Sequence, residues 1–253
     1  MPVTPAQEWC SSRYGENARF VSDLGQPVLE LLNPQPGERI LDLGCGDGAL
    51  TEKLAAAGAQ IVGVDASQDM VTAAIARGID ARVMNASELG FDCEFDAVFS
   101  NAVLHWIKDN PDAVIQGVSR ALRTGGRFAA EMGGHGCVAA ITVALCATLR
   151  EFGVADPSGL LPWYFPTVPE YRQRLERSGL RVEYIQLIPR PTLLPTGIRG
   201  WLETFATPFT RSLPAERRSA FLDSVTEQLR PVLCDSTGQW TADYIRLRFL
   251  ARK

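Results

Sequence analysis

The chain has 253 residues, of which 46% are hydrophobic and 21% are charged, as is usual for a soluble globular protein. Its formal net charge of −4 argues against a nucleic-acid surface, and no apolar run is long enough to cross a membrane. Because no charged and apolar leader opens the chain, we expect a cytoplasmic protein without nucleic-acid or membrane partners. Six cysteines with no C-x-x-C pair, together with only two histidines, predict no metal site.

Positive charge is unevenly distributed along the chain. After residue 149, 14 of the 15 basic residues are arginine. One interpretation is an ordinary solvated surface, since most charge runs lie in solvent. The other is that the second half offers arginine side chains to an anionic substrate.

The hydrophobic pattern predicts alternating strands and helices. Residues 5–32 have near-helical apolar spacing, with a break at Tyr14-Gly15. After the Pro34–Gly37 turn, strands are predicted at 39–43, 60–64, 80–84, 95–100 and 127–132, with helices at 50–57, 68–76 and 112–122. The second half is less regular, with strands predicted at 181–187 and 244–250 and helices at 138–152, at 170–178 and within 197–233. This alternation predicts an α/β fold with a doubly wound, mostly parallel sheet and helical insertions.

Three glycines, Gly44, Gly46 and Gly48, follow the first strand directly. Glycine there lets the backbone approach a ligand at the sheet edge where α/β proteins bind one. The same residues also fit the dinucleotide pattern G-x-G-x-x-G/A. Asp42 lies just before them and would repel a pyrophosphate but attract a cation, such as the sulfonium and ammonium of S-adenosylmethionine. Asp65 ends the second strand and can bind ribose hydroxyls, which either cofactor would offer.

This segment resembles the Asp/Glu-x-Gly-x-Gly-x-Gly motif of class I S-adenosylmethionine-dependent methyltransferases. Residues 64–70 resemble that family's ribose loop, with Met70 placed to pack near adenine. Residues 85–88 resemble its adenine-edge loop, although Asn85 stands where the family usually has Asp. With matching motifs at 95–101 and 121–127, the resemblance covers about residues 37–132 and implies a seven-stranded Rossmann-like fold.

The resemblance also implies a division of the chain and a set of cofactor contacts. Residues 1–36 would form an N-terminal helical lid, 37–135 the S-adenosylmethionine-binding core, and 136–253 the rest of the sheet with acceptor-binding insertions at 138–169 and 192–240. The implied cofactor contacts are Tyr14, Arg19, Asp42, Gly44, Cys45, Gly46, Gly48, Asp65, Ala66, Met70, Asn85, Ala86, Ser87 and Asn101. The alternative is that Tyr14 is a core residue and Arg19 a surface one. Cys45 could suggest redox chemistry, but a small side chain that fits a tight turn is the simpler interpretation.

Residues 100–106 and the helical front end are most similar to small-molecule methyltransferases, chiefly carboxyl O-methyltransferases of the trans-aconitate type. A looser similarity is to the enzyme that methylates malonyl-carrier protein. The resemblance thus implies a small-molecule acceptor, with a carboxylate as one candidate, and S-adenosylhomocysteine as product. It does not indicate an oligomeric state.

Candidate acceptor residues follow the fourth and fifth strands. His105 is either a base or acceptor contact or a packing residue of its loop, and His135 is either catalytic or an exposed loop histidine. Several aromatic side chains, each of which could equally be core, are expected to line the acceptor pocket. These are Trp106, Trp163, Tyr164, Trp201 and Phe205.

Three other functions remain compatible with parts of the pattern. The same fold and cofactor can support lyase or cyclase chemistry at the sulfonium. A nicotinamide-dependent oxidoreductase would share the glycines and Asp65, but Asp42 opposes it. A non-catalytic binding protein would bind the cofactor without turnover.

Overall fold

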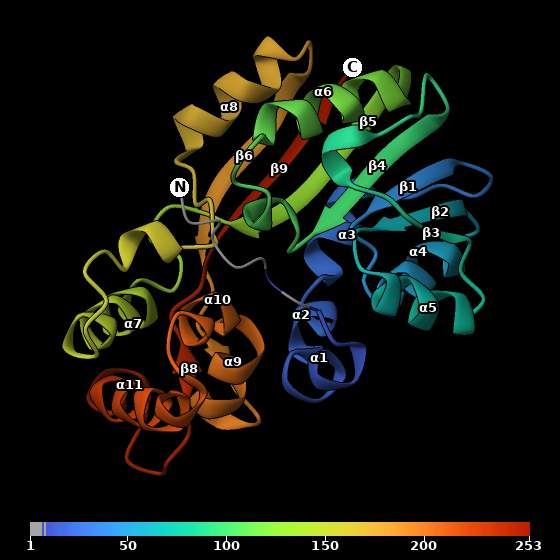
Figure 1. Ribbon diagram of the computed structural model, residues 1–253. Coiled ribbons are helices and arrows are strands. Elements are labelled where there is room, and N and C mark those ends of the chain that lie inside the picture. The colour runs from blue at the N-terminus through green and yellow to red at the C-terminus, as the bar shows by residue number, and fades with distance from the viewer. Residues whose placement is uncertain (1–6, 8) are drawn as a thin grey trace.

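The computed structural model describes residue 7 and residues 9–253. These residues form a seven-stranded sheet in the order β3-β2-β1-β4-β5-β9-β6 (Figure 1). Its strands are β1 (Arg39–Leu43), β2 (Gln60–Asp65), β3 (Ala81–Val83), β4 (Phe95–Asn101), β5 (Leu122–Gly133), β6 (Arg181–Pro189) and β9 (Ile245–Arg252). β9 runs antiparallel to both its neighbours, whereas the pairs among β1 to β5 are parallel. The predicted mostly parallel, seven-stranded sheet is therefore confirmed.

Helices cover both faces of the sheet because side chains alternate along each strand. On β1, Ile40 packs in one cluster with Leu54, while Leu41 and Leu43 pack in another with Val118. One face is covered by α3 (Gln26–Leu32) and α4 (Thr51–Ala56), and the other by α6 (Pro111–Ala121) and α8 (Val168–Arg177). α5 (Gln68–Ala76) packs against β2 and β3. The sheet is thus doubly wound.

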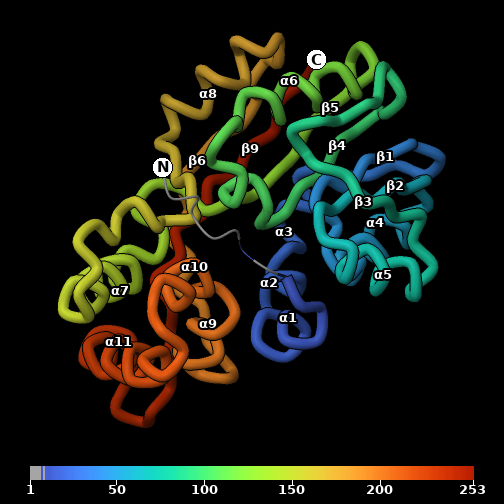
Figure 2. Tube along the Cα trace, viewed as in Figure 1, coloured from blue at the N-terminus to red at the C-terminus, as the bar shows by residue number. Residues whose placement is uncertain are grey.

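A helical bundle lies beside the sheet and has a hydrophobic core of its own (Figure 2). Its large buried side chains include Phe209, Phe221 and Trp201. It consists of α7 (Ala139–Glu151), α9 (Gly197–Phe205), α10 (Thr207–Arg211) and α11 (Arg218–Leu233), with a two-stranded sheet of β7 (Thr192–Leu193) and β8 (Thr241–Ala242). The bundle comes from the insertions that the sequence predicted.

The N-terminal helical region is broken into three short helices, where the sequence suggested one helical region with a break. α1 (Ser11–Asn17) and α2 (Arg19–Asp23) precede α3, and residues 1–6 and 8 of the predicted region lie outside the described residues. α1 bridges the bundle and the sheet layer: the Asn17 amide donates to Thr204 Oγ1 of α9 at 3.1 Å, and the Ser11 N–H donates to Asp69 of α5 at 2.6 Å. These bonds place Tyr14 between the two halves of the molecule.

Short 3-10 turns complete the fold: η1 (Ala86–Glu88), η2 (Leu104–Trp106), η3 (Ser158–Leu160) and η4 (Ala215–Arg217). β5 starts five residues earlier than predicted, because residues 124–126, expected to form a turn, are part of the strand. The pairing register between β4 and β5 shifts between Phe95 and Ala97. No helix in the described part of the chain combines the length and apolarity needed to span a bilayer.

Candidate functional site

Two neighbouring cavities open at the carboxyl ends of the central strands. The larger, of about 450 Å³, is lined by residues that follow β1, β2 and β4. The smaller, of about 40 Å³, is lined mainly by aromatic side chains of η2, α9 and the loop before α8. Trp9, Tyr14, Ala102 and Trp106 line both cavities, so the two cavities share a wall.

The glycine turn forms the floor of the larger cavity. Gly44 and Gly46 have φ values of +78° and +55°, in the left-handed region that favours glycine. A Cβ on Gly44 would lie 2.2 Å from Val103 Cγ2, so the two segments are in direct contact. A Cβ on Gly46 would meet no atom within 4 Å and would instead project into open space at the cavity. A ligand in the cavity could therefore approach the Gly46 backbone closely.

We expect Gly44→Ala to lower both stability and cofactor affinity. The positive φ costs about 1–2 kcal/mol for an L side chain, and the clash with Val103 adds about 1–3 kcal/mol. Gly37→Ala is the matched control, because Gly37 has a φ of +83° but no atom within 4 Å of its Cβ position. Urea denaturation should show a clearly larger decrease in the free energy of unfolding for Gly44→Ala than for Gly37→Ala. Equal decreases would mean that the clash with Val103 contributes nothing.

Asp65 is held by backbone groups at the edge of the larger cavity. Its two oxygens accept hydrogen bonds from the Gly46 N–H at 3.0 Å and the Ser67 N–H at 2.9 Å. Burial raises the pKa of Asp65, and these N–H groups partly offset that rise. Asp65 lines the cavity, and each of its oxygens keeps a lone pair that could accept a hydrogen bond from a ribose hydroxyl.

Further along the same wall lie Ala66, Met70, Asn85 and Ala86, all predicted cofactor contacts. Met70 is buried. The Asn85 Oδ1 already accepts the Ser87 N–H at 3.0 Å and so caps η1, which leaves its NH2 group and one lone pair for a ligand. Tyr14 and Asn101 close the cavity from the opposite side.

Asp42 lies behind the glycine turn in a separate small cavity with Tyr14, Asp47 and Asn101. It is buried and accepts a hydrogen bond from Thr51 Oγ1 at 2.7 Å. Burial raises the pKa of Asp42 to about 7, with a smaller contribution from the charge of Asp65. A bound cation would favour the ionised carboxylate.

This raised pKa predicts a pH-dependent affinity for S-adenosylmethionine. In the free protein Asp42 binds its proton below about pH 7, and cation binding must then expel that proton. Affinity should therefore fall as pH decreases below about 7, by up to about tenfold per unit. Calorimetric titrations between about pH 6 and 8 should show this slope for the wild type and none for Asp42→Asn. Parallel profiles for the two proteins would contradict the assignment.

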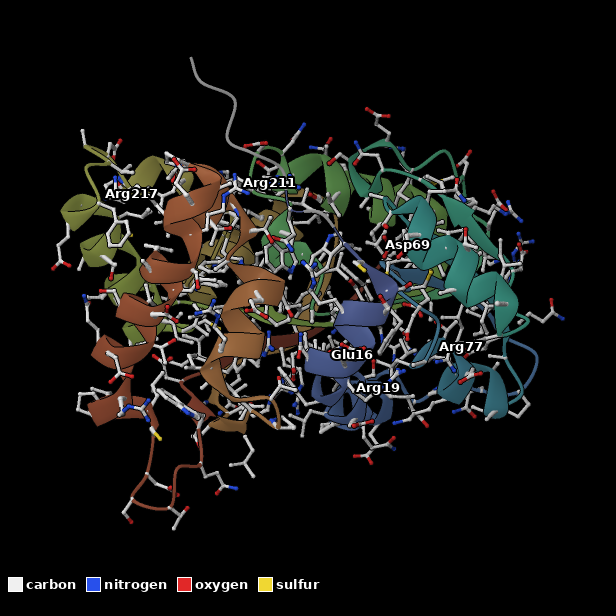
Figure 3. All side chains as sticks on the ribbon, turned by 60° about the horizontal axis from the view of Figure 1, so that its bottom comes forward. Glu16, Arg19, Asp69, Arg77, Arg211 and Arg217 are labelled. Atoms are coloured by element: carbon white, nitrogen blue, oxygen red, sulfur yellow. The ribbon has the colours of Figure 1, made fainter. Side chains whose placement is uncertain are left out.

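Several residues that were predicted to contact the cofactor do not line the larger cavity and instead contact other parts of the protein. Arg19 forms an ion pair with Asp47 at 3.2 Å, and Arg77 lies 3.6 Å from the same carboxylate. Figure 3 shows these two arginines on the same side of the molecule, one from the N-terminal helices and one from the end of α5. Neither lines the larger cavity, so the structure gives no direct support to Arg19 as a cofactor contact.

Cys45, Gly48 and Ser87 also lie off the larger cavity. The Cys45 side chain packs against Gly63 of β2, and burial raises the pKa of its thiol. Gly48 packs against Ala74 of α5. These positions shape the loops that hold a ligand, and a redox role for Cys45 finds no support in this packing.

The smaller cavity contains four of the five predicted pocket aromatics. Trp106, Trp163, Trp201 and Phe205 line it, and the Trp201 Nε1–H donates to the Tyr244 hydroxyl at 2.6 Å. Sequence reasoning left Trp9, Phe165 and Tyr244 out of the predicted set; they complete the wall. Their aromatic character was visible, but their position depends on how the insertions fold back over the sheet.

Tyr164 does not belong to this pocket, contrary to prediction. Its hydroxyl donates to Glu170 at 2.7 Å and accepts a hydrogen bond from Arg174 Nε at 2.9 Å, so the ring is directed toward α8. Adjacent residues in extended backbone point in opposite directions, which is why Trp163 and Phe165 line the cavity and Tyr164 does not.

His105 lies inside the smaller cavity and is buried. Its Nδ1 accepts the Gly133 N–H at 3.2 Å, which assigns the ring proton of the neutral form to Nε2. Burial, with a smaller contribution from the charge of Arg246, holds the pKa of His105 well below its usual range. The side chain is thus a neutral hydrogen-bond donor at physiological pH, and this geometry does not suit a general base.

His135 is not part of either cavity, which corrects the prediction that it is catalytic. It is exposed, and its backbone N–H donates to the Pro166 carbonyl at 2.9 Å. His135 belongs to the loop that follows β5. From this loop it is the later residues Cys137 and Val138 that line the smaller cavity.

Arg246 is the main residue that sequence reasoning missed. It lies near the start of β9, is 2% exposed and lines the smaller cavity. A signal existed in the sequence, where Arg246 and Arg248 share one face of the strand predicted at 244–250. Among the described residues, no group of three or more His, Cys, Asp or Glu side chains is placed to hold a metal ion.

Comparison with known proteins finds methyltransferases among the relatives of this chain. The profile of a family described as "Methyltransferase domain" matches residues 41–130, which contain the glycine turn and Asp65. An uncharacterized methyltransferase of Schizosaccharomyces pombe is 40% identical over 265 residues, covering 98% of this chain and 99% of that protein. A trans-aconitate 2-methyltransferase of Mycolicibacterium gilvum is 39% identical over 121 residues, which is 46% of this chain and 47% of that enzyme.

Solved structures share the fold at low sequence identity. The YcgJ protein of Bacillus subtilis has a TM-score of 0.61 and 20% identity, over 91% of this chain and 97% of that one. Phosphoethanolamine N-methyltransferase 2 of Haemonchus contortus, solved with S-adenosyl-L-methionine, has a TM-score of 0.59 and 21% identity, over 91% of this chain and 52% of that one. At these identities the likeness concerns the fold alone.

Proposed function

Because the chain belongs to the class I S-adenosylmethionine-dependent methyltransferases, we propose that it methylates a small-molecule acceptor that carries a carboxylate. The larger cavity fits this cofactor: Gly46 offers bare backbone to it, and Asp65 presents oriented oxygens to its ribose. When bound, S-adenosylmethionine supplies a methyl group on a positively charged sulfur. The acceptor then belongs in the smaller cavity, which shares its wall with the larger one.

The observation that carries the proposal is that the titratable groups of the smaller cavity favour hydrogen-bond donation over proton uptake. His105 is neutral with its proton on Nε2, as described above. Burial raises the pKa of the Tyr244 hydroxyl to about 12 and also raises the pKa of the Tyr14 hydroxyl and the Cys137 thiol. All three therefore keep their protons at neutral pH, and Arg246 adds a positive charge.

A pocket of this kind suits a nucleophile that arrives already ionised. A general base is needed only where the acceptor atom must lose a proton during the reaction. A carboxylate is ionised at neutral pH without help and is bound well by arginine and by N–H donors. Phenols and ammonium groups would need a base that the described lining does not offer. The chain's contribution is then binding, orientation and exclusion of water.

The test is a product screen with S-adenosylmethionine against matched sets of carboxylic acids, phenols and amines. We expect stoichiometric S-adenosylhomocysteine and a base-labile methyl ester with at least one acid. Methylated phenols or amines as the only products would overturn the carboxylate. Methylthioadenosine in place of S-adenosylhomocysteine would instead indicate lyase or cyclase chemistry.

A further inference from the structure

Arg246 carries a buried guanidinium group. Within residue 7 and residues 9–253, its side chain has no ion pair or hydrogen bond, and its Nε is buried and unsatisfied. Its Cζ lies 4.2 Å from the centre of the Tyr244 ring, which is a favourable contact for its charge. Burying an unpaired charge costs several kcal/mol. A ligand that supplies the missing anion would recover that cost.

The two nearby carboxylates form no ion pair with Arg246 in the described part of the chain. Glu131 on β5 is 1% exposed and binds Arg190 at 2.5 Å and Arg248 at 2.7 Å. Asp243 accepts the Ala140 N–H at 2.8 Å through Oδ2 at the start of α7, and its buried Oδ1 has no hydrogen-bond partner among the described residues. Arg248 shares a face of β9 with Arg246, but of these two only Arg248 pairs with Glu131. Among residues 7 and 9–253, Arg246 thus carries a positive charge that no carboxylate pairs with, and it lines the smaller cavity.

Most of the remaining cavity wall is apolar. Its walls are aromatic rings packed against one another, with Trp106 and Phe205 stacked at 6.2 Å and Trp163 and Phe165 at 5.8 Å. Its volume of about 40 Å³ has room for only a few water molecules, and thus for one small polar group beside Arg246. Apolar surface continues along Trp9 and Trp106 toward the larger cavity.

We propose that Arg246 anchors the carboxylate of an acid with a single negative charge and an apolar body, and that the pocket selects against acids with several carboxylates. This rests on the carboxylate-methylating function proposed above. Additional carboxylates would be buried against aromatic rings without a cation, which is strongly unfavourable. The trans-aconitate methyltransferases that match about half of this chain are named for a tricarboxylate, so the two pockets would differ in charge.

The reaction balances without proton transfer. One carboxylate oxygen is held by Arg246, with the His105 Nε2–H as a second donor. The other oxygen forms a bond to the methyl carbon as the carbon–sulfur bond breaks, and that electron pair stays on sulfur. The products are a neutral methyl ester and S-adenosylhomocysteine. Because the ester carries no charge, it loses the attraction of Arg246, which favours its release.

The experiment compares Arg246→Met and Arg246→Lys with the wild type, using hexanoate and phenylacetate as single-charge acids and trans-aconitate as the tricarboxylate. Arg252→Met is the matched control, because Arg252 lies on the same face of β9 but is paired with Glu183 at the surface. Methyl ester is measured by mass spectrometry, and acid binding in the presence of S-adenosylhomocysteine is measured by calorimetry. Binding of S-adenosylmethionine alone checks that each variant is folded.

For the wild type, kcat/KM should be at least about tenfold higher for a single-charge acid than for trans-aconitate. Arg246→Met should lower kcat/KM and acid affinity by about 100-fold, Arg246→Lys less, and Arg252→Met not at all. Preference for trans-aconitate, or full acid affinity in Arg246→Met, would overturn this inference while leaving carboxylate methylation intact. Failure to methylate any acid would overturn the proposed function itself.

Discussion

Replacing Asp65 by alanine should weaken S-adenosylmethionine binding by at least about 100-fold, because the variant loses two charge-assisted hydrogen bonds to the ribose, each worth roughly 1.5–3 kcal/mol. The change also leaves the Gly46 and Ser67 N–H groups without their acceptor, so the loop loses its preorganisation. Calorimetry with S-adenosylmethionine and with S-adenosylhomocysteine measures the effect, which should be similar for both.

Asp80→Ala is the matched control for that prediction. Asp80 lies just before the neighbouring strand β3 and pairs with Arg82 on the surface at 3.1 Å, so its loss should not alter cofactor affinity. Asp65→Asn should give an intermediate affinity, since an amide keeps one acceptor. An unchanged affinity for S-adenosylmethionine in Asp65→Ala would contradict the proposal that Asp65 binds the ribose.

Replacing Glu131 by alanine should lower the free energy of unfolding by about 3–5 kcal/mol, the usual cost of removing one partner from a buried ion pair. The change leaves the guanidinium groups of Arg190 and Arg248 unpaired, each with a side chain only 16% exposed, close to the charge of Arg246. Thermal unfolding followed by circular dichroism should show a midpoint lower by about 10 °C.

The control for Glu131 is Glu183→Ala on β6. Glu183 also binds two arginines, Arg181 and Arg252, but these are exposed at the sheet edge. Exposed pairs contribute at most about 1 kcal/mol, so this variant should unfold close to the wild-type midpoint. Similar losses in the two variants would show that burial at Glu131 is not decisive.

The half of the site that binds the cofactor could be predicted from sequence because it is local. The residues from Asp42 to Gly48 form one strand and one turn, and Asp65 ends the next parallel strand, which pairs in register with the first. Strand periodicity therefore brought these groups to one edge of the sheet. Which of these side chains line the larger cavity still needed coordinates, since Asp42 lies in a separate small cavity and Cys45 packs against β2.

The acceptor half depends on contacts between segments distant in sequence, which periodicity does not reveal. Arg246 meets His105 only because the last strand inserts between β5 and β6. Trp163 and Tyr164 are neighbours in sequence, yet one faces the cavity and the other α8. Glu131 lies directly opposite Arg248 on the adjacent strand β5. For this reason Arg248 forms an ion pair with Glu131, whereas Arg246 does not.

The central claim is that the acceptor arrives as an anion and that the pocket donates hydrogen bonds without taking a proton. The most direct measurement is the pH dependence of kcat/KM for the best acid, at saturating S-adenosylmethionine so that the titration of Asp42 does not contribute. Between about pH 6 and 9 the profile should be flat, because the acid is ionised and His105 stays neutral throughout. A rise of about tenfold per pH unit over this range would reveal a base and contradict the account.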